Sequence, residues 1–325
     1  SVMMEKLLVT QSPHLSHEDS TRSIMADVLI ALLPATVAGC VIFGWHSLFV
    51  ILTSVFTAVL AEFICRKIMK RSNTVGDLSA AVTGLLLALN MPPEVPLWIV
   101  AIGSIVAIVV VKQFFGGIGN NFANPAITAR IVLLVSFPTA MTAWKAPFGS
   151  TGEVTSSATT GEIIDILTSA TPLSDTAIKG GYYSYTQLLF GQHPGCIGET
   201  FSLLLILGGI YLVIRKVISP VTPICFVGTV AVCSLIAGED PLYMILSGGL
   251  MLGAIFMATD YATSPVSRLG KMIFGIGCGL ITFVIRHFGY LPEGVSYAIL
   301  IMNLLVPYIN KITAPKPFGW EAEKK

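Results

Sequence analysis

The sequence predicts an all-α integral membrane protein with about ten transmembrane helices, arranged as two inverted five-helix repeats. Composition is the first reason: hydrophobic residues make up 54% of the 325 residues and charged residues only 11%, whereas soluble domains carry about 25% charge. The mean hydropathy is +0.80. The second reason is that the apolar residues fall into ten segments, most of them near the length that spans a bilayer. The third is the distribution of basic residues between these segments.

The ten predicted spans lie five on each side of a hydrophilic insertion at 138–198. They are 23–43, 48–65, 76–91, 97–111, 125–137, 200–217, 220–237, 241–257, 270–287 and 294–313. The chain therefore divides into an N-terminal arm at 1–22, a first repeat at 23–137, the insertion, a second repeat at 199–313 and a tail at 314–325.

The lysines and arginines predict the orientation, because loops on the cytoplasmic side are enriched in them. If the N-terminus is cytoplasmic, fifteen of the nineteen basic residues fall on that face. The opposite face holds Lys145, Lys179 and Arg286, and Arg130 lies within a span. Both termini are thus expected in the cytoplasm and the insertion outside.

Two halves with an odd number of spans each must have opposite orientations, which is the arrangement of an inverted repeat. The similarity between the halves is faint. The run Thr83 to Ala88 in the third span resembles Gly248 to Gly253 in the eighth, and small residues there equally fit close helix packing. This architecture also occurs in solute transporters and channels that hold no redox cofactor, so a transporter or channel stays open as an alternative to a redox function.

The insertion contains a run of small hydroxylated residues, Thr168, Ser169, Ala170 and Thr171, three residues after Asp165. Small neighbours would let a transferase reach a hydroxyl group and let backbone N–H groups approach phosphate oxygens. A similar run occurs upstream at 156–159. Such runs are also ordinary loop composition.

The string from Asp165 to Leu173 resembles the flavinylation motif of two related proteins. These are the D subunit of the Rnf electron-transport complex and the B subunit of the Na⁺-translocating NADH:quinone reductase. The resemblance implies that FMN is esterified through its phosphate to Thr171, and only Thr171 is followed by Pro-Leu as in the family. Ile166 and Ser169 stand where the family usually has glycine, and Thr159 therefore stays open as the attachment residue.

Two polar strings, at 116–125 and 260–265, lie between consecutive spans on the predicted cytoplasmic face. Each runs through an aromatic residue and an alanine to a proline, and irregular backbone at membrane depth is tolerated only when it is buried in protein or lines a cavity. One interpretation is a capped helix end. The other, implied by the resemblance, is a second, non-covalent flavin (riboflavin or FMN) or a coupling-ion site. Its candidate residues are Asn120, Asn121, Asn124, Asp260, Tyr261 and Thr263.

Charges within spans are costly and often functional; the conspicuous ones are Asp27, Glu62, Asp77 and Arg130. Glu62 lies one helical turn before Arg66 and is expected to extend to the membrane interface. The six cysteines form no CxxC pair, and we expect no disulfide. The sequence indicates no metal site and no catalytic residue.

The resemblance extends over most of the chain and implies a subunit of a multi-protein complex that is not active alone. That complex moves electrons between ferredoxin and NAD and couples this transfer to Na⁺ or H⁺ translocation. The implied partners are Rnf subunits of the A, B, C, E and G types, a flavin transferase and the lipid of the cytoplasmic (inner) membrane. Nucleic acid is not expected, since the net charge is only +1.

Overall fold

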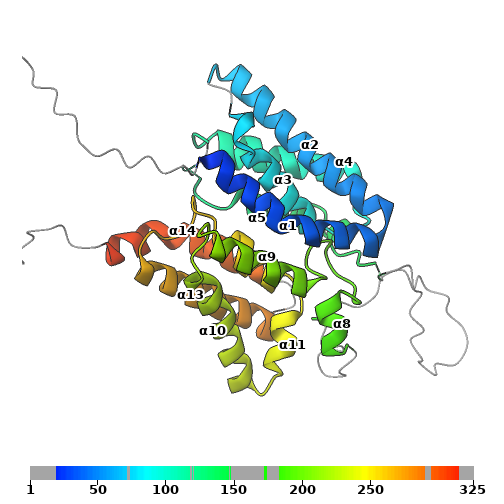
Figure 1. Ribbon diagram of the computed structural model, residues 1–325, viewed down its shortest axis with the longest axis vertical. Helices are drawn as coiled ribbons and strands as arrows, with labels where there is room; N and C mark the ends of the chain where they lie inside the picture. The colour runs from blue at the N-terminus through cyan, green and yellow to red at the C-terminus, as the bar shows by residue number, and fades with distance from the viewer. Residues whose placement is uncertain are drawn as a thin grey trace, which may run out of the picture.

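The computed structural model describes residues 20–71, 74–117, 119, 121–145, 147, 172–173, 183–289 and 294–314. These residues form helices, turns and loops, and no strand occurs among them (Figure 1). The first half consists of α1 (Thr21–Phe43), α2 (Trp45–Ile68), η1 (Val75–Asp77), α3 (Ser79–Leu89), α4 (Leu97–Ile105), the π-helix η2 (Val106–Gln113) and α5 (Pro125–Ser136).

The second half consists of α9 (Ser202–Ile214), α10 (Val221–Ala237), α11 (Pro241–Leu246), α12 (Leu250–Leu252), the π-helix η4 (Gly253–Met257), α13 (Arg268–Phe288) and α14 (Val295–Thr313). Two short helices, α6 (Pro138–Met141) and α8 (Tyr185–Phe190), lie within the predicted insertion. In Figure 1 the blue-to-cyan helices of the first half lie on one side of the molecule and the green-to-red helices of the second half on the other.

The chain is a multi-pass membrane protein. Four described helices, α1, α2, α13 and α14, are long and apolar enough to cross a membrane. The others are shorter, yet each of the ten predicted spans coincides with a helix or a chain of helices. The eighth is broken between Leu246 and Leu250, and its last part is the π-helix η4.

Helix ends follow capping rules that are visible in the sequence. Ser20 and Ser267 accept hydrogen bonds from the backbone N–H groups of Ser23 (3.2 Å) and Gly270 (2.9 Å), at the starts of α1 and α13. Each serine satisfies a donor that has no partner within its helix. Asp240 does the same for α11, whose first residue is Pro241.

The two halves meet along α1 and α9. Gly208 on α9 approaches α1 so closely that a Cβ there would lie 2.5 Å from the carbonyl oxygen of Ala31. Near one end of this contact, Asp27 accepts hydrogen bonds from the Tyr211 hydroxyl (2.9 Å) and the Arg215 guanidinium (3.2 Å). The halves also meet where α5 packs on α14.

Helices α2 and α3 make the most extensive helix contact of the first half. Ser54 donates a hydrogen bond of 2.7 Å to the carbonyl oxygen of Gly84. A Cβ at Gly84 would lie 2.9 Å from the Cα of Val55 and 3.0 Å from the Cβ of Ala58. Backbone atoms cannot give way as a flexible side chain can, so this contact requires glycine.

We therefore expect Gly84→Val to destabilise the protein by about 1–3 kcal/mol, the usual cost of overpacking a core. Gly228→Val on α10 is the matched control, because a Cβ there meets nothing within 4 Å. Thermal unfolding in detergent, followed by size-exclusion chromatography, measures both. Equal melting temperatures for the two variants would contradict the close α2–α3 contact.

Candidate functional site

The first polar string ends in a helix cap. The Asn124 side-chain oxygen accepts hydrogen bonds from the backbone N–H groups of Ala126 (3.0 Å) and Ile127 (3.4 Å), and Pro125 is the first residue of α5. The capping interpretation is therefore confirmed for this string. The same side chain also donates to the carbonyl oxygen of Met257 at 3.3 Å, so the cap of a first-half helix binds the end of η4 in the second half.

The second string folds around its own carboxylate. Asp260 accepts hydrogen bonds from the Ala262 N–H (3.3 Å) and the Thr263 hydroxyl (3.2 Å). Desolvation is the main influence on Asp260 and raises the pKa of its carboxyl group, and the two hydrogen bonds oppose that effect. In the amide orientation that satisfies its neighbours, Asn303 of α14 donates to the Thr263 carbonyl and accepts from the Asn124 N–H, both at 3.1 Å.

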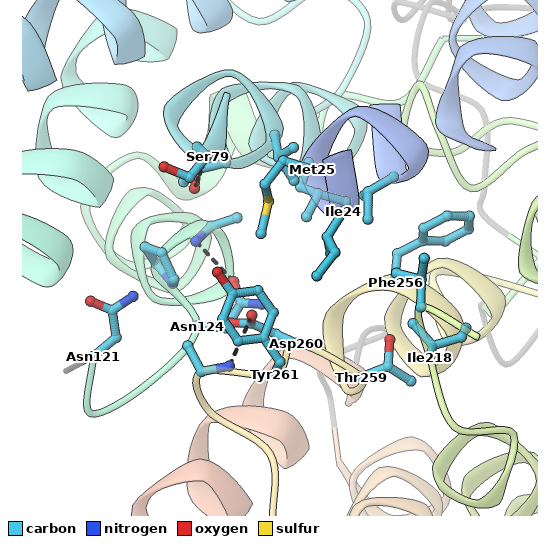
Figure 2. Close-up of a pocket in the computed structure, with 18 of the residues that line it drawn as sticks. Ile24, Met25, Ser79, Asn121, Asn124, Ile218, Phe256, Thr259, Asp260 and Tyr261 are labelled. Atoms are coloured by element: carbon cyan, nitrogen blue, oxygen red, sulfur yellow. Dashed lines mark hydrogen bonds between the residues drawn. The ribbon is translucent and has the colours of Figure 1, made fainter. Parts of the chain in front are cut away.

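The two strings border one cavity between the halves, with a volume of about 90 Å³ (Figure 2). One wall comes from the starts of α1 and α3, and the opposite wall from η4 and the loop that follows it. Its oxygen atoms belong to hydroxyl, amide and carboxylate groups, and apolar side chains such as Met25 and Phe256 fill the rest of the wall. The site therefore offers polar groups within an apolar frame.

Four of the predicted site residues, Asn121, Asn124, Asp260 and Tyr261, line this cavity. Thr263 is buried and does not line it; its hydroxyl binds Asp260. The remaining predicted site residues lie outside the described residues. They are Asn120 of the first string and the residues on which the covalent attachment depends, Asp165, Thr168, Ser169, Ala170 and Thr171.

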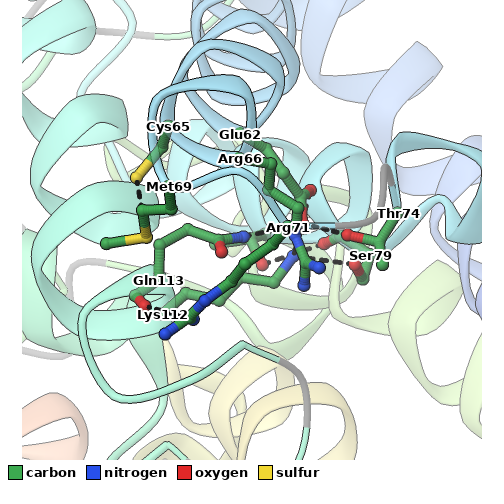
Figure 3. Close-up of polar contacts among 10 residues, drawn as sticks. Glu62, Cys65, Arg66, Met69, Arg71, Thr74, Ser79, Lys112 and Gln113 are labelled. Carbon is green, nitrogen blue, oxygen red and sulfur yellow. Dashed lines mark hydrogen bonds and ion pairs between the residues drawn. The ribbon is translucent and has the colours of Figure 1, made fainter.

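A buried ionic cluster beside the cavity overturns the expectation for Glu62, which does not reach the interface: its exposed fraction is 0%. Its carboxylate lies 3.1 Å from the ammonium group of Lys112 and accepts hydrogen bonds from Gln113 (2.9 Å) and Thr74 (3.0 Å) (Figure 3). A buried charge is tolerated only when it is paired and hydrogen-bonded, and this cluster satisfies that condition.

Lys112 is buried, which the charge count does not predict. The charge count assigns it to the basic residues of the cytoplasmic face, but its side chain is 2% exposed, lines the cavity and donates to Ser79 at 2.7 Å. The sequence indicates the burial of Lys112 only in part, because this residue directly follows an apolar span. The pairing with Glu62 gives no local signal, since fifty positions separate the two residues.

The insertion returns to the helices next to the predicted attachment residue. The Tyr243 hydroxyl of α11 donates to the carbonyl oxygen of Pro172 at 2.9 Å. Leu173 is buried against Gly248, where a Cβ would lie 2.5 Å from the leucine side chain and 3.1 Å from the Arg286 guanidinium. Arg286, which the charge count assigns to the outer face, is 9% exposed and donates to the Met244 carbonyl at 2.7 Å.

Arg130 and Cys196 form a further buried polar cluster. The Arg130 guanidinium donates to the Asn90 side chain (2.8 Å), to Ser296 of α14 (3.3 Å) and to the Cys196 sulfur (3.2 Å). All six cysteines are free thiols, as expected. Cys196 is buried, and its thiol donates to the Asn90 carbonyl at 3.3 Å.

The ionic cluster predicts a marked asymmetry between single and double substitutions. We expect Lys112→Met to destabilise the protein by about 3–5 kcal/mol, because the carboxylate of Glu62 is left buried without its cation. Adding Glu62→Gln to that variant should recover much of the loss. Thermal unfolding of the two single variants and the double variant in detergent measures this coupling. Additive losses would contradict a direct Glu62–Lys112 pair.

Comparison with known proteins agrees with this architecture. The model of the NQR2, RnfD, RnfE family matches residues 8–319. The D subunit of the Na⁺-translocating ferredoxin:NAD⁺ oxidoreductase complex of Acetobacterium woodii is 44% identical over 98% of this chain and 97% of its own. The D subunit of the proton-translocating ferredoxin:NAD⁺ oxidoreductase complex of Clostridium ljungdahlii is 39% identical over 96% of each chain. The D subunit of an ion-translocating oxidoreductase complex of Stutzerimonas stutzeri is 39% identical over 94% of each chain. The chain is a member of the NQR2, RnfD, RnfE family.

Proposed function

We propose that this chain is the D-type membrane subunit of an ion-translocating ferredoxin:NAD⁺ oxidoreductase complex. It carries FMN covalently on Thr171 and passes electrons across the membrane, coupled to the movement of Na⁺ or H⁺. The observation that carries the proposal is the similarity, over at least 94% of each chain, to relatives named as this subunit. Its partners are the other subunits of that complex and the transferase that attaches the flavin.

Two pairs of helices support an inverted repeat within the proposed ten-span topology. The first helix of one half, α1, packs on the first of the other, α9, and the fifth helices, α5 and α14, pack on each other. Elements next to a two-fold axis contact their own equivalents, so these two contacts support such a relation between the halves. The basic residues favour a cytoplasmic N-terminus. With five spans in each half, the attachment segment then lies outside and the C-terminus also lies in the cytoplasm.

The segment that follows Thr171 suits a fixed attachment point. Pro172 is bound by Tyr243 of α11 and Leu173 is buried against Gly248, in the break between α11 and α12, so the chain is anchored there directly after the proposed ester. The buried Arg286 guanidinium, beside Leu173, supplies positive charge for a phosphate group near this point. The bound flavin supplies the redox chemistry, and these residues hold its tether in place.

The cavity between the halves suits a coupling ion better than a second flavin. Its volume of about 90 Å³ is well below the roughly 300–1,000 Å³ of pockets that hold ring-shaped ligands. It is large enough for a small cation with several waters, and carboxylate, amide and hydroxyl oxygens are the ligands that hard cations prefer. We place the ion path at Asn124 and Asp260, beside the Glu62–Lys112 pair.

Thr171→Ala should abolish the covalent flavin and leave the helical bundle folded, because the side chain lost is in the insertion rather than in the membrane core. In-gel flavin fluorescence after denaturation, together with intact-mass measurement, detects the ester. Thr159→Ala is the matched control and should keep the flavin. A fluorescent band that persists in Thr171→Ala and disappears in Thr159→Ala would transfer the attachment to Thr159. Absence of flavin from the native chain would favour a transporter.

Asp260→Asn should lower ion uptake per electron transferred severalfold, because the amide keeps an acceptor for Ala262 and Thr263 but removes the charge that would bind a cation. Asp240→Asn is the control: Asp240 caps α11 in a similar way and does not line the cavity. Ferredoxin-dependent NAD reduction and ion uptake are measured per assembled complex in vesicles. Unchanged coupling in Asp260→Asn, with Thr171 still flavinylated, would refute the ion site and leave the flavin proposal intact.

A further inference from the structure

An apolar groove runs along the outer surface between α2 and the continuous α4–η2 helix. Leu60, Ile64 and Ile68 form one side, Ile105 and Val109 the other, and Phe114 closes one end. Its volume is about 390 Å³, and its wall exposes only apolar atoms. The polar cluster around Glu62 lies on the buried side of the same two helices, because Lys112 and Gln113 of η2 bind Glu62 of α2 (Figure 3).

The length of the groove matches one leaflet of a bilayer. It extends along α2 from Thr57 to Ile68, and eleven steps of about 1.5 Å give a length of about 17 Å. Half of a hydrocarbon core of about 30 Å is about 15 Å. The groove is therefore long enough for the part of an acyl chain that lies in one leaflet.

Positive charge gathers at the closed end of the groove. Lys67, Lys70 and Arg71 are exposed there, where α2 ends. Arg71 donates to the carbonyl oxygen of Gln113 at 3.4 Å, which holds its guanidinium beside Phe114. Lys67 follows the groove residue Ile64 by three positions, and residues three apart in a helix lie on the same side. The apolar groove therefore ends in cations at the depth of lipid headgroups.

We propose that this groove is a binding site for one anionic phospholipid. An acyl chain lies between α2 and η2, and the headgroup phosphate is held by Lys67, Lys70 and Arg71. Basic residues next to a membrane helix attract anionic headgroups, and Arg binds phosphate through paired N–H donors. The bound lipid would cover the outside of the helix pair that carries the Glu62–Lys112 cluster, and so would support the wall of the cavity.

The test uses the assembled complex in nanodiscs that contain phosphatidylcholine and a trace of phosphatidylglycerol with a diazirine on its acyl chain. After illumination, mass spectrometry should find the label on residues 57–69, and unlabelled phosphatidylglycerol should displace it while phosphatidylcholine does not. Lys67→Gln and Arg71→Gln should each weaken this binding about fivefold. Ile64→Trp should block the groove and remove the label without changing the amount of complex.

Two control variants change similar residues away from the groove. Lys311→Gln removes an exposed cation at the end of α14, and Val284→Trp fills a lipid-facing position on α13; both should keep the label. Equal displacement by phosphatidylcholine would overturn the anionic site. Labelling of a partner subunit's peptide in place of residues 57–69 would show that a protein covers the groove, and would overturn the proposal as well.

Discussion

The constraint that governs this structure is that a polar or charged group buried in an apolar bundle must find its partner within the protein. No bulk water is available at membrane depth, and an unpaired charge there costs several kcal/mol. The carboxylate of Glu62 meets this constraint through Lys112, Gln113 and Thr74, which come from other elements. Buried polar contacts therefore determine which helices lie together, in addition to apolar packing.

The same constraint explains how the halves are joined. Asp27 on α1 is satisfied by Tyr211 and Arg215 at the end of α9. Arg130 on α5 donates to Ser296 on α14, and Asn124 binds the end of η4. Each of these contacts crosses from one half to the other. Relative motion of the halves would have to exchange these partners for others.

Two π-helices place polar groups where regular α-helices would not. The segment η2 ends the fourth predicted span and carries both Lys112 and Gln113 to Glu62. The segment η4 ends the eighth and presents the carbonyl of Met257 to Asn124. π-Helical segments are rare in proteins, and those that occur within α-helices are often found at functional sites. Here both border the cavity between the halves, which associates the local distortion with the proposed ion path.

The sequence by itself determined the class of the protein, the positions of the ten apolar segments and the two polar strings, because hydropathy, capping residues and prolines act locally. It also assigned both strings to one face, and Asn124 and Asp260 border one cavity in the structure. It did not predict that Glu62 is buried, or that Lys112, Arg286 and Cys196 point into the protein. Those outcomes depend on residues far apart in the chain, and only tertiary packing decides whether a charge near a helix end faces water or a buried partner.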